Sequence, residues 1–145
     1  MASTAPVDIA SQASDELLAA CHRLIPQLSS SAQPLTISEL AEIVGSDSTL
    51  MFVARVDGKI VGLLTLAVFR IPTAVRAWIE DVVVDSSVRS HGVGEALNQA
   101  AITEAKRRGA KTVDLTSRPS REAANRLYKR IGFVARETNI YRFST

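Results

Sequence analysis

The 145-residue sequence contains few of the residue types that build redox, metal or nucleic-acid sites. Its one cysteine, Cys21, cannot form an internal disulfide and has no histidine or aspartate at a metal-ligand spacing. Aromatic residues make up only 5%, and those after residue 85 are not interleaved with basic clusters as in nucleic-acid-binding proteins. No apolar run approaches the roughly 20 residues of a membrane span, and residues 1–10 lack the regions of a signal peptide. We therefore expect a cytoplasmic protein that binds no metal, nucleic acid or membrane.

The residues that are present suit a compact domain with an uneven distribution of charge. An apolar content of 46% over this length favours one globular domain, residues 1–145. The net charge is only +2, but residues 1–85 carry five basic against ten acidic residues, and residues 86–145 carry twelve against five. One interpretation is a polyanionic ligand at the second part and a cationic ligand at the first. The alternative is two ordinary solvated surfaces.

The spacing of apolar residues predicts a mixed α/β fold. Ser14 is a candidate N-cap for a first helix, Thr36 and Glu39 form a capping box for a second, and Asp57-Gly58 favours a tight hairpin turn. The expected elements are helices at 14–28, 36–45, 92–108 and 121–132, strands at 49–56, 59–69, 78–84 and 111–117, a loop at 70–77, and two short strands within 133–143. This order predicts a mainly antiparallel central sheet flanked by helices.

The turn from strand to helix at residues 89–94 carries the clearest chemical signal, Arg89-Ser90-His91-Gly92-Val93-Gly94. A helix N-terminus presents unpaired N–H groups and the positive end of its dipole, so it can bind phosphate without side chains. Glycines at such a turn let a diphosphate approach the backbone closely. Taken alone, the pattern also fits plain turn geometry.

This motif resembles the Gln/Arg-x-x-Gly-x-Gly/Ala signature of the GNAT family of N-acetyltransferases. A second signature of that family, a helical tyrosine a few residues before Gly-Phe, is matched by Tyr128 and Gly132-Phe133. The two motifs occur in the family's order, with a predicted strand between them. The resemblance covers residues 49–143 and implies a GNAT-like acyl-CoA N-acyltransferase fold.

The resemblance implies that acetyl-coenzyme A is the co-substrate and that no metal is needed. The pyrophosphate would lie on the backbone amides of residues 89–94, where we expect the His91 side chain to be exposed. The pantetheine arm would hydrogen-bond along a strand that splays from its neighbour, at Val82, Val83 and Val84. Seven residues before its motif tyrosine the family often carries an asparagine; this chain has Arg121 there, and Asn125, one turn before the tyrosine, is the alternative.

Acetyl transfer from a thioester to an amine requires a neutral amine, a stabilised oxyanion and a protonated leaving thiolate. The resemblance implies that Glu80 takes the proton of the amine and that Tyr128 protonates the thiolate, and we expect Asp81 to bind a cationic acceptor. The structural alternatives are ion-paired or capping carboxylates and a tyrosine packed in the core. Alternation along the strand predicts Glu80 on the same face as Trp78, Val82 and Val84, with Asp81 on the other.

These residues predict an N-acetyltransferase that moves acetyl from acetyl-coenzyme A to a primary amine by direct attack, since no activated thiol is apparent. The acidic first part favours a small cationic amine as the acceptor. A peptide or protein N-acetyltransferase is an alternative, and a non-catalytic acyl-CoA-binding sensor module is an alternative of a different class. The short strands expected within 133–143 offer a sheet edge through which a homodimer could form.

Overall fold

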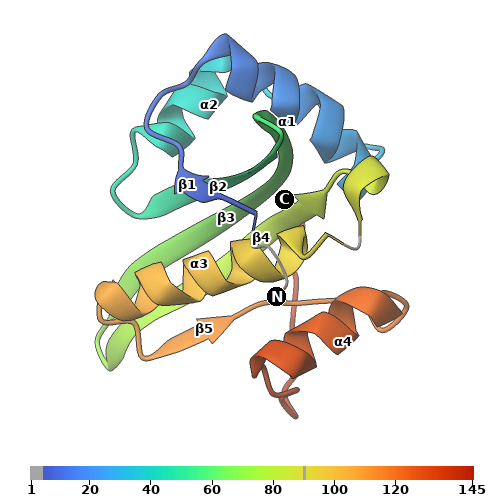
Figure 1. Cartoon of the computed structure of the whole chain (residues 1–145). Coiled ribbons are helices and arrows are strands. Elements are labelled where there is room, and N and C mark those ends of the chain that lie inside the picture. Colours follow the sequence, from blue (N-terminus) through green and yellow to red (C-terminus); the bar gives the residue numbers. More distant parts are fainter. Residues whose placement is uncertain (1–4, 90) are drawn as a thin grey trace. The chain divides into compact units, whose positions relative to one another are not determined.

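The structure is a computed structural model that describes residues 5–89 and 91–145 (Figure 1). Ser90 of the predicted phosphate turn therefore lies outside the described residues. The chain divides into two compact units, Met1–Leu115 and Thr116–Thr145. The first unit contains β1 (Val7–Ile9), α1 (Asp15–Leu28), α2 (Ile37–Val44), β2 (Thr49–Val56), β3 (Lys59–Ile71), β4 (Ala74–Val84), η1 (Ser86–Val88), α3 (Val93–Arg107) and β5 (Thr112–Asp114), and the second contains α4 (Glu122–Ile131). That residues 1–145 form a single domain stays a prediction.

The first two helices begin at the caps that the sequence predicts. The Ser14 hydroxyl accepts the N–H of Leu17 at 3.1 Å at the start of α1. At the start of α2, the Thr36 hydroxyl accepts the N–H of Glu39 at 3.1 Å, and the Glu39 carboxylate accepts the N–H of Thr36 at 2.9 Å. Each bond satisfies a backbone donor that a helix leaves unpaired in its first turn, so these boundaries are set locally.

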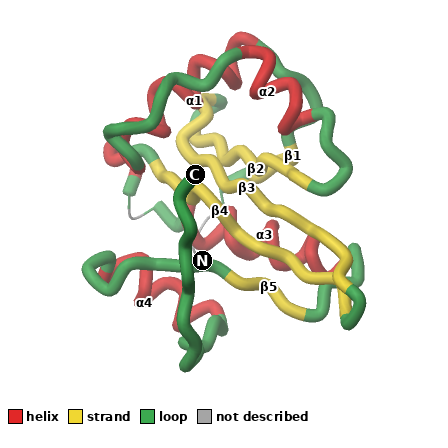
Figure 2. Tube along the Cα trace, turned by 180° about the vertical axis from the view of Figure 1, so that it is seen from behind, coloured by secondary structure: helices red, strands yellow, loops and turns green. Residues whose placement is uncertain are grey.

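The sheet of the first unit has the strand order β1-β2-β3-β4-β5. The first three pairings are antiparallel and the β4–β5 pairing is parallel. The β2–β3 hairpin turns at Asp57 and Gly58, whose φ angles of 51° and 78° are those that such a dipeptide tolerates. The prediction of a mixed, mainly antiparallel sheet with helices packed on it is confirmed (Figure 2).

Helices lie on both faces of this sheet. A Cβ atom at Gly62 would come within 2.9 Å of the side chains of Val93 and Leu97, so α3 packs on the face to which Gly62 belongs. The adjacent β3 residue, Leu63, points to the opposite face, where it joins a buried cluster with α1 and α2. Figure 1 shows α3 in front of the strands and Figure 2 shows it behind them. The sheet that contains β4 is therefore packed against helices on both faces.

The loop predicted at 70–77 is wrong. β3 continues to Ile71 and β4 begins at Ala74, so only Pro72 and Thr73 turn between them. The strand pairing continues to the turn, with Phe69 opposite Arg76. Proline fixes φ at a value suited to a turn corner, and the flanking β-branched residues suit strands, so a tight hairpin forms where the sequence suggested an interruption.

The two strands predicted within 133–143 are also wrong, since residues 116–145 contain α4 and no strand. β propensity depends on pairing with a partner strand, and this unit supplies none. Four large apolar side chains of the segment are exposed, those of Val134, Ile140, Tyr141 and Phe143. The strand predicted at 111–117 is confirmed but spans only Thr112–Asp114, and the short edge strand β1 was not predicted.

Candidate active site

The strand β4 pairs with β5 over only part of its length. It pairs with β5 over residues 76–78 only, the last pair joining Trp78 and Asp114, whereas β4 itself continues to Val84. Beyond Trp78 the strand therefore has β3 on one side and is no longer paired with β5 on the other. The predicted splaying of this strand at residues 82–84, which would offer backbone groups to the amides of a ligand, stays a prediction.

A bulge reorients the side chains in the middle of β4. Asp81 has a φ of 50°, and the register moves from Glu80 opposite Thr65 to Val83 opposite Leu63. Three steps along β4 therefore match two along β3, so Val83 shares the face of Glu80 and Val84 does not. The prediction that Val84 lies on the face of Glu80 is wrong, because strict alternation fails at a bulge. Bulges next to active sites commonly redirect a functional side chain.

Glu80 is exposed and held by one neighbouring side chain. The indole Nε1 of Trp78 donates a hydrogen bond of 2.9 Å to Oε1 of Glu80. The ion pairs observed among the described residues do not include Glu80 or Asp81, and both side chains are exposed. Alternation along the strand predicted that Trp78 lies on the face of Glu80, but Trp78 was assigned no role. The spacing of two residues along one strand was the signal that could have indicated this hydrogen bond.

The turn after β4 leads to an uncapped helix N-terminus. Gly92 is the N-cap of α3, has a left-handed φ of 72°, and provides no side-chain hydrogen bond to the helix. A Cβ atom there would meet no other atom within 4 Å, so the space beside Gly92 is open. His91 is exposed, as predicted. Open space next to the positive end of a 15-residue helix fits the diphosphate of coenzyme A.

In the second unit, Tyr128 lies on α4 and is buried. Its ring meets that of Phe133 edge-on, with centroids 5.8 Å apart and planes at 74°. Burial raises the pKa of the Tyr128 phenol above its usual value of 10, and the positive charge of Arg121 opposes this. The phenol is therefore protonated at neutral pH, the state that a general acid requires.

The two candidates for the family's asparagine also lie in the second unit. Asn125 donates from its side-chain nitrogen to the carbonyl oxygen of Arg118 at 3.0 Å, so it is partly engaged in holding the start of α4. Arg121 is the N-cap residue of α4 and makes no capping hydrogen bond with its side chain. Contact of Asn125 with the cofactor stays a prediction.

No group of three or more histidine, cysteine, aspartate or glutamate residues gathers among the described residues in a way that could hold a metal ion. None of the helices in that part of the chain has the length and apolar character that crossing a membrane requires.

Comparison with known proteins assigns the chain to a family. A model of the Acetyltransferase (GNAT) family matches residues 15–133. An uncharacterised N-acetyltransferase of Methanocaldococcus jannaschii is 35% identical over 94 residues, which are 63% of this chain and 42% of the relative, so the match spans less than half the length of that protein. Among solved structures, a transcriptional regulator of Bacillus halodurans is 28% identical with a TM-score of 0.79, over 96% of this chain and all of that one. An acetyltransferase of Trypanosoma brucei is 27% identical with a TM-score of 0.78, over 96% and 99% of the two chains.

The chain belongs to the Acetyltransferase (GNAT) family. The predicted family and fold class are therefore confirmed, and the family assignment supports the predicted class of enzyme, an acetyltransferase. The family match begins at residue 15, well before the resemblance at 49–143 that the motifs carried. The family match therefore includes the helices α1 and α2, which precede both motifs.

Proposed function

We propose that this protein transfers the acetyl group of acetyl-coenzyme A to a primary amine, and that the acceptor is a small cationic amine. The observation that carries the proposal is that β4 continues beyond its pairing with β5, bears the exposed carboxylate of Glu80, and leads to the N-terminus of α3 at Gly92. Residues 82–84 would bind the pantetheine amides, and residues 89–94 the diphosphate. Asn125 would contact the arm of the cofactor.

The reaction proceeds by direct attack. Glu80 takes a proton from the acceptor ammonium, and the neutral nitrogen attacks the thioester carbonyl carbon, forming the C–N bond. A backbone N–H near Val82 holds the resulting oxyanion. The C–S bond then breaks, the thiolate takes the proton of Tyr128, and the acetylated nitrogen returns a proton to the phenolate. The products are an amide and coenzyme A.

The character of the acceptor follows from the charge around Glu80. Residues 1–85 are acidic overall, and Glu80 and Asp81 are both exposed on β4. Trp78, held beside Glu80, offers an aromatic face to which a cation can be attracted. These features favour a polyamine, an aminoglycoside-like compound or a lysine side chain over a neutral amine. A peptide acceptor is the alternative that the same chemistry allows.

The catalytic roles are tested by following thiol release from acetyl-coenzyme A across a panel of amines. We expect Glu80→Gln and Tyr128→Phe each to lower kcat by about 100-fold, within the usual contribution of general acid–base catalysis. Glu137→Gln and Tyr141→Phe are the matched controls, because both residues are exposed in the C-terminal segment, and these variants should retain wild-type rates. Unchanged kcat in the Glu80 and Tyr128 variants would refute the assigned roles.

A second candidate function is a non-catalytic sensor that binds acyl-coenzyme A and acts on a partner. It is favoured by the similarity to the Bacillus halodurans protein, which is described as a transcriptional regulator. Tight binding of coenzyme A without turnover of any amine would select this candidate over the enzyme.

A further inference from the structure

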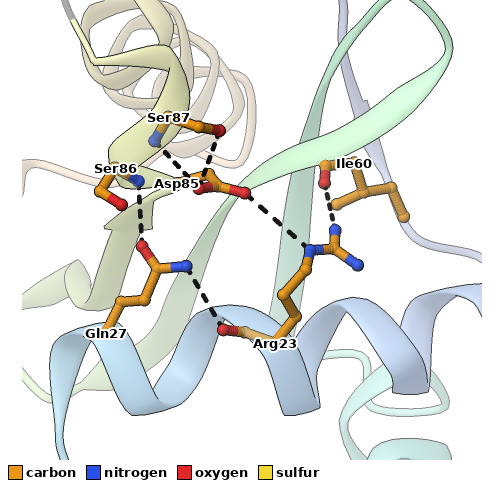
Figure 3. Close-up of polar contacts among 6 residues, drawn as sticks. All are labelled: Arg23, Gln27, Ile60, Asp85, Ser86 and Ser87. Carbon is orange, nitrogen blue, oxygen red and sulfur yellow. Dashed lines mark hydrogen bonds and ion pairs between the residues drawn. The ribbon is translucent and has the colours of Figure 1, made fainter.

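A polar network joins α1 to the segment that opens the phosphate turn (Figure 3). Gln27 accepts the backbone N–H of Ser86 through Oε1 at 2.9 Å. Asp85 accepts both the N–H of Ser87 at 3.1 Å and its hydroxyl at 3.0 Å, all through Oδ1. Oδ2 of Asp85 lies 3.9 Å from Nε of Arg23. The start of the turn is therefore tied to a helix about 60 residues earlier in the chain.

The network surrounds a carboxylate that the fold has buried. Asp85 is 7% exposed, and burying a charge is costly unless it is hydrogen-bonded or paired. The N–H of Ser87 is the main cause that holds the pKa of Asp85 below its usual range, with bonds from the Ser87 hydroxyl and Gln27 adding to it. Arg23 is itself fixed, because its NH2 group donates to the carbonyl oxygen of Ile60 at 2.6 Å. The contacts converge on residues 85–87 from α1 and from β3.

The turn is fixed at its other end as well. Val93, the first residue of α3, is buried against the sheet, where its side chain occupies the space beside Gly62. Between Ser87 and Gly92 the chain has four residues, so the direction in which the backbone leaves η1 limits how the amides of 89–94 can be presented. Holding both ends in advance reduces the ordering cost of binding a ligand there.

We propose that Gln27 and Arg23 are positioning residues for the diphosphate of coenzyme A, acting through residues 85–87. Neither residue touches the cofactor in this account. They hold residues 85–87, from which the chain enters the turn, so a helix on the opposite side of the sheet from α3 contributes to donor affinity. The inference rests on the donor site of the proposed function and is independent of which amine accepts the acetyl group.

The test substitutes Gln27→Met, which keeps the length of the side chain and removes the acceptor of the Ser86 N–H. Gln99→Met is the matched control, since Gln99 is also exposed on a helix and its side chain has no observed hydrogen bond to another described residue. The single tryptophan, Trp78, lies on β4 and reports binding by its fluorescence. Both proteins are titrated with coenzyme A and with pantetheine, which has the same arm without the diphosphate.

We expect Gln27→Met to weaken coenzyme A binding about tenfold, equivalent to about 1.4 kcal/mol, and to leave pantetheine binding and the Gln99→Met control unchanged. Unchanged affinity for coenzyme A would overturn the proposal, as would an equal loss for both ligands, which indicates general destabilisation. Because the titrations need no turnover, the failure of any amine to be acetylated by the wild type would count against the proposed function alone.

Discussion

At Gly62 a single hydrogen atom in place of a side chain decides how closely α3 approaches the sheet. A Cβ atom there would lie 2.9 Å from Cγ1 of Val93 and 2.9 Å from Cδ1 of Leu97, both of which are buried. We expect Gly62→Ala to lower the free energy of unfolding by about 1–3 kcal/mol, as overpacking does, measured by urea denaturation. Adding Val93→Ala should restore part of this loss, because it removes one of the two clashes. Simple additivity of the two losses would contradict this account.

Gly92 matters for its backbone conformation and for the open space beside it. Its φ of 72° is strained for other residues, and a Cβ atom would stand where the diphosphate is expected to approach. We expect Gly92→Ala to cost about 1 kcal/mol of stability and to weaken coenzyme A binding about tenfold. Gly109 has a φ of 82° and equally open surroundings, away from the turn, so Gly109→Ala should show the same loss of stability without the loss of affinity. Equal affinities in the two variants would contradict the role of the turn.

Residue identity alone could not reveal the bulge at Asp81. Its positive φ arises from the pairing of β4 with β3, where Glu80 and Val83 are matched to Thr65 and Leu63. The assumption of strict alternation along β4 therefore predicted the wrong face for Val84. By contrast, the exposure of His91 was predicted from the motif, because a turn that receives a ligand on its backbone leaves the side chain at the surface.

Among the elements, the C-terminal end of α3 includes a carboxylate, Glu104, whose pKa is lowered by neighbouring arginines. Glu104 receives hydrogen bonds from Arg107 at 2.6 and 2.8 Å and from Arg108 at 2.8 Å. These bonds lower the pKa of Glu104 from 4.5 to about 2. Arg108 also donates to the carbonyl oxygen of Asp47 at 2.6 Å, so the group fastens the end of α3 to the chain before β2.

The sign of the pH dependence follows from that lowered pKa. A carboxylate whose pKa falls on folding stabilises the fold fully above its unfolded pKa, and this contribution is lost as the pH falls from about 4.5 to about 2. We expect Glu104→Gln to cost about 1 kcal/mol at pH 7, well below the full shift because Arg107 is 68% exposed to solvent. The difference in melting temperature between wild type and variant should shrink below pH 4.5. A difference that stays constant down to pH 2 would contradict this.

Elements set by local signals were predicted well, and those set by pairing were not. The capping box at Thr36 and the turn at Asp57-Gly58 are contained in a few neighbouring residues, and both form as expected. The length of β5 and the absence of strands in residues 116–145 depend on partner strands far away in the sequence, and the hairpin at Pro72 depends on the pairing of its two strands. The network of Gln27 and Asp85 was missed for the same reason, since its members are about 60 residues apart.

For the whole molecule, the separation of charge corresponds to the two sides of the proposed reaction. Residues 1–85, which carry Glu80 and Asp81, hold ten acidic against five basic residues, whereas residues 86–145 hold twelve basic against five acidic. Coenzyme A is anionic and the proposed acceptor is cationic, so the signs of the two charge totals agree with the proposed pair of substrates. The sequence motifs predict the donor because they form a backbone turn that suits its phosphates. No motif of this kind predicts the acceptor, whose proposed class rests on the charge and exposure of Glu80 and Asp81.

The central claim, acetylation of a cationic amine, is tested most directly by detecting the product. Wild-type protein is incubated with acetyl-coenzyme A and either a polyamine or a neutral amine of similar size, and the amines are analysed by mass spectrometry. The account predicts acetylated polyamine in amounts equal to the thiol released, with far less of the neutral product. Absence of any acetylated amine, although coenzyme A binds with its affinity dependent on Gly92, would contradict it.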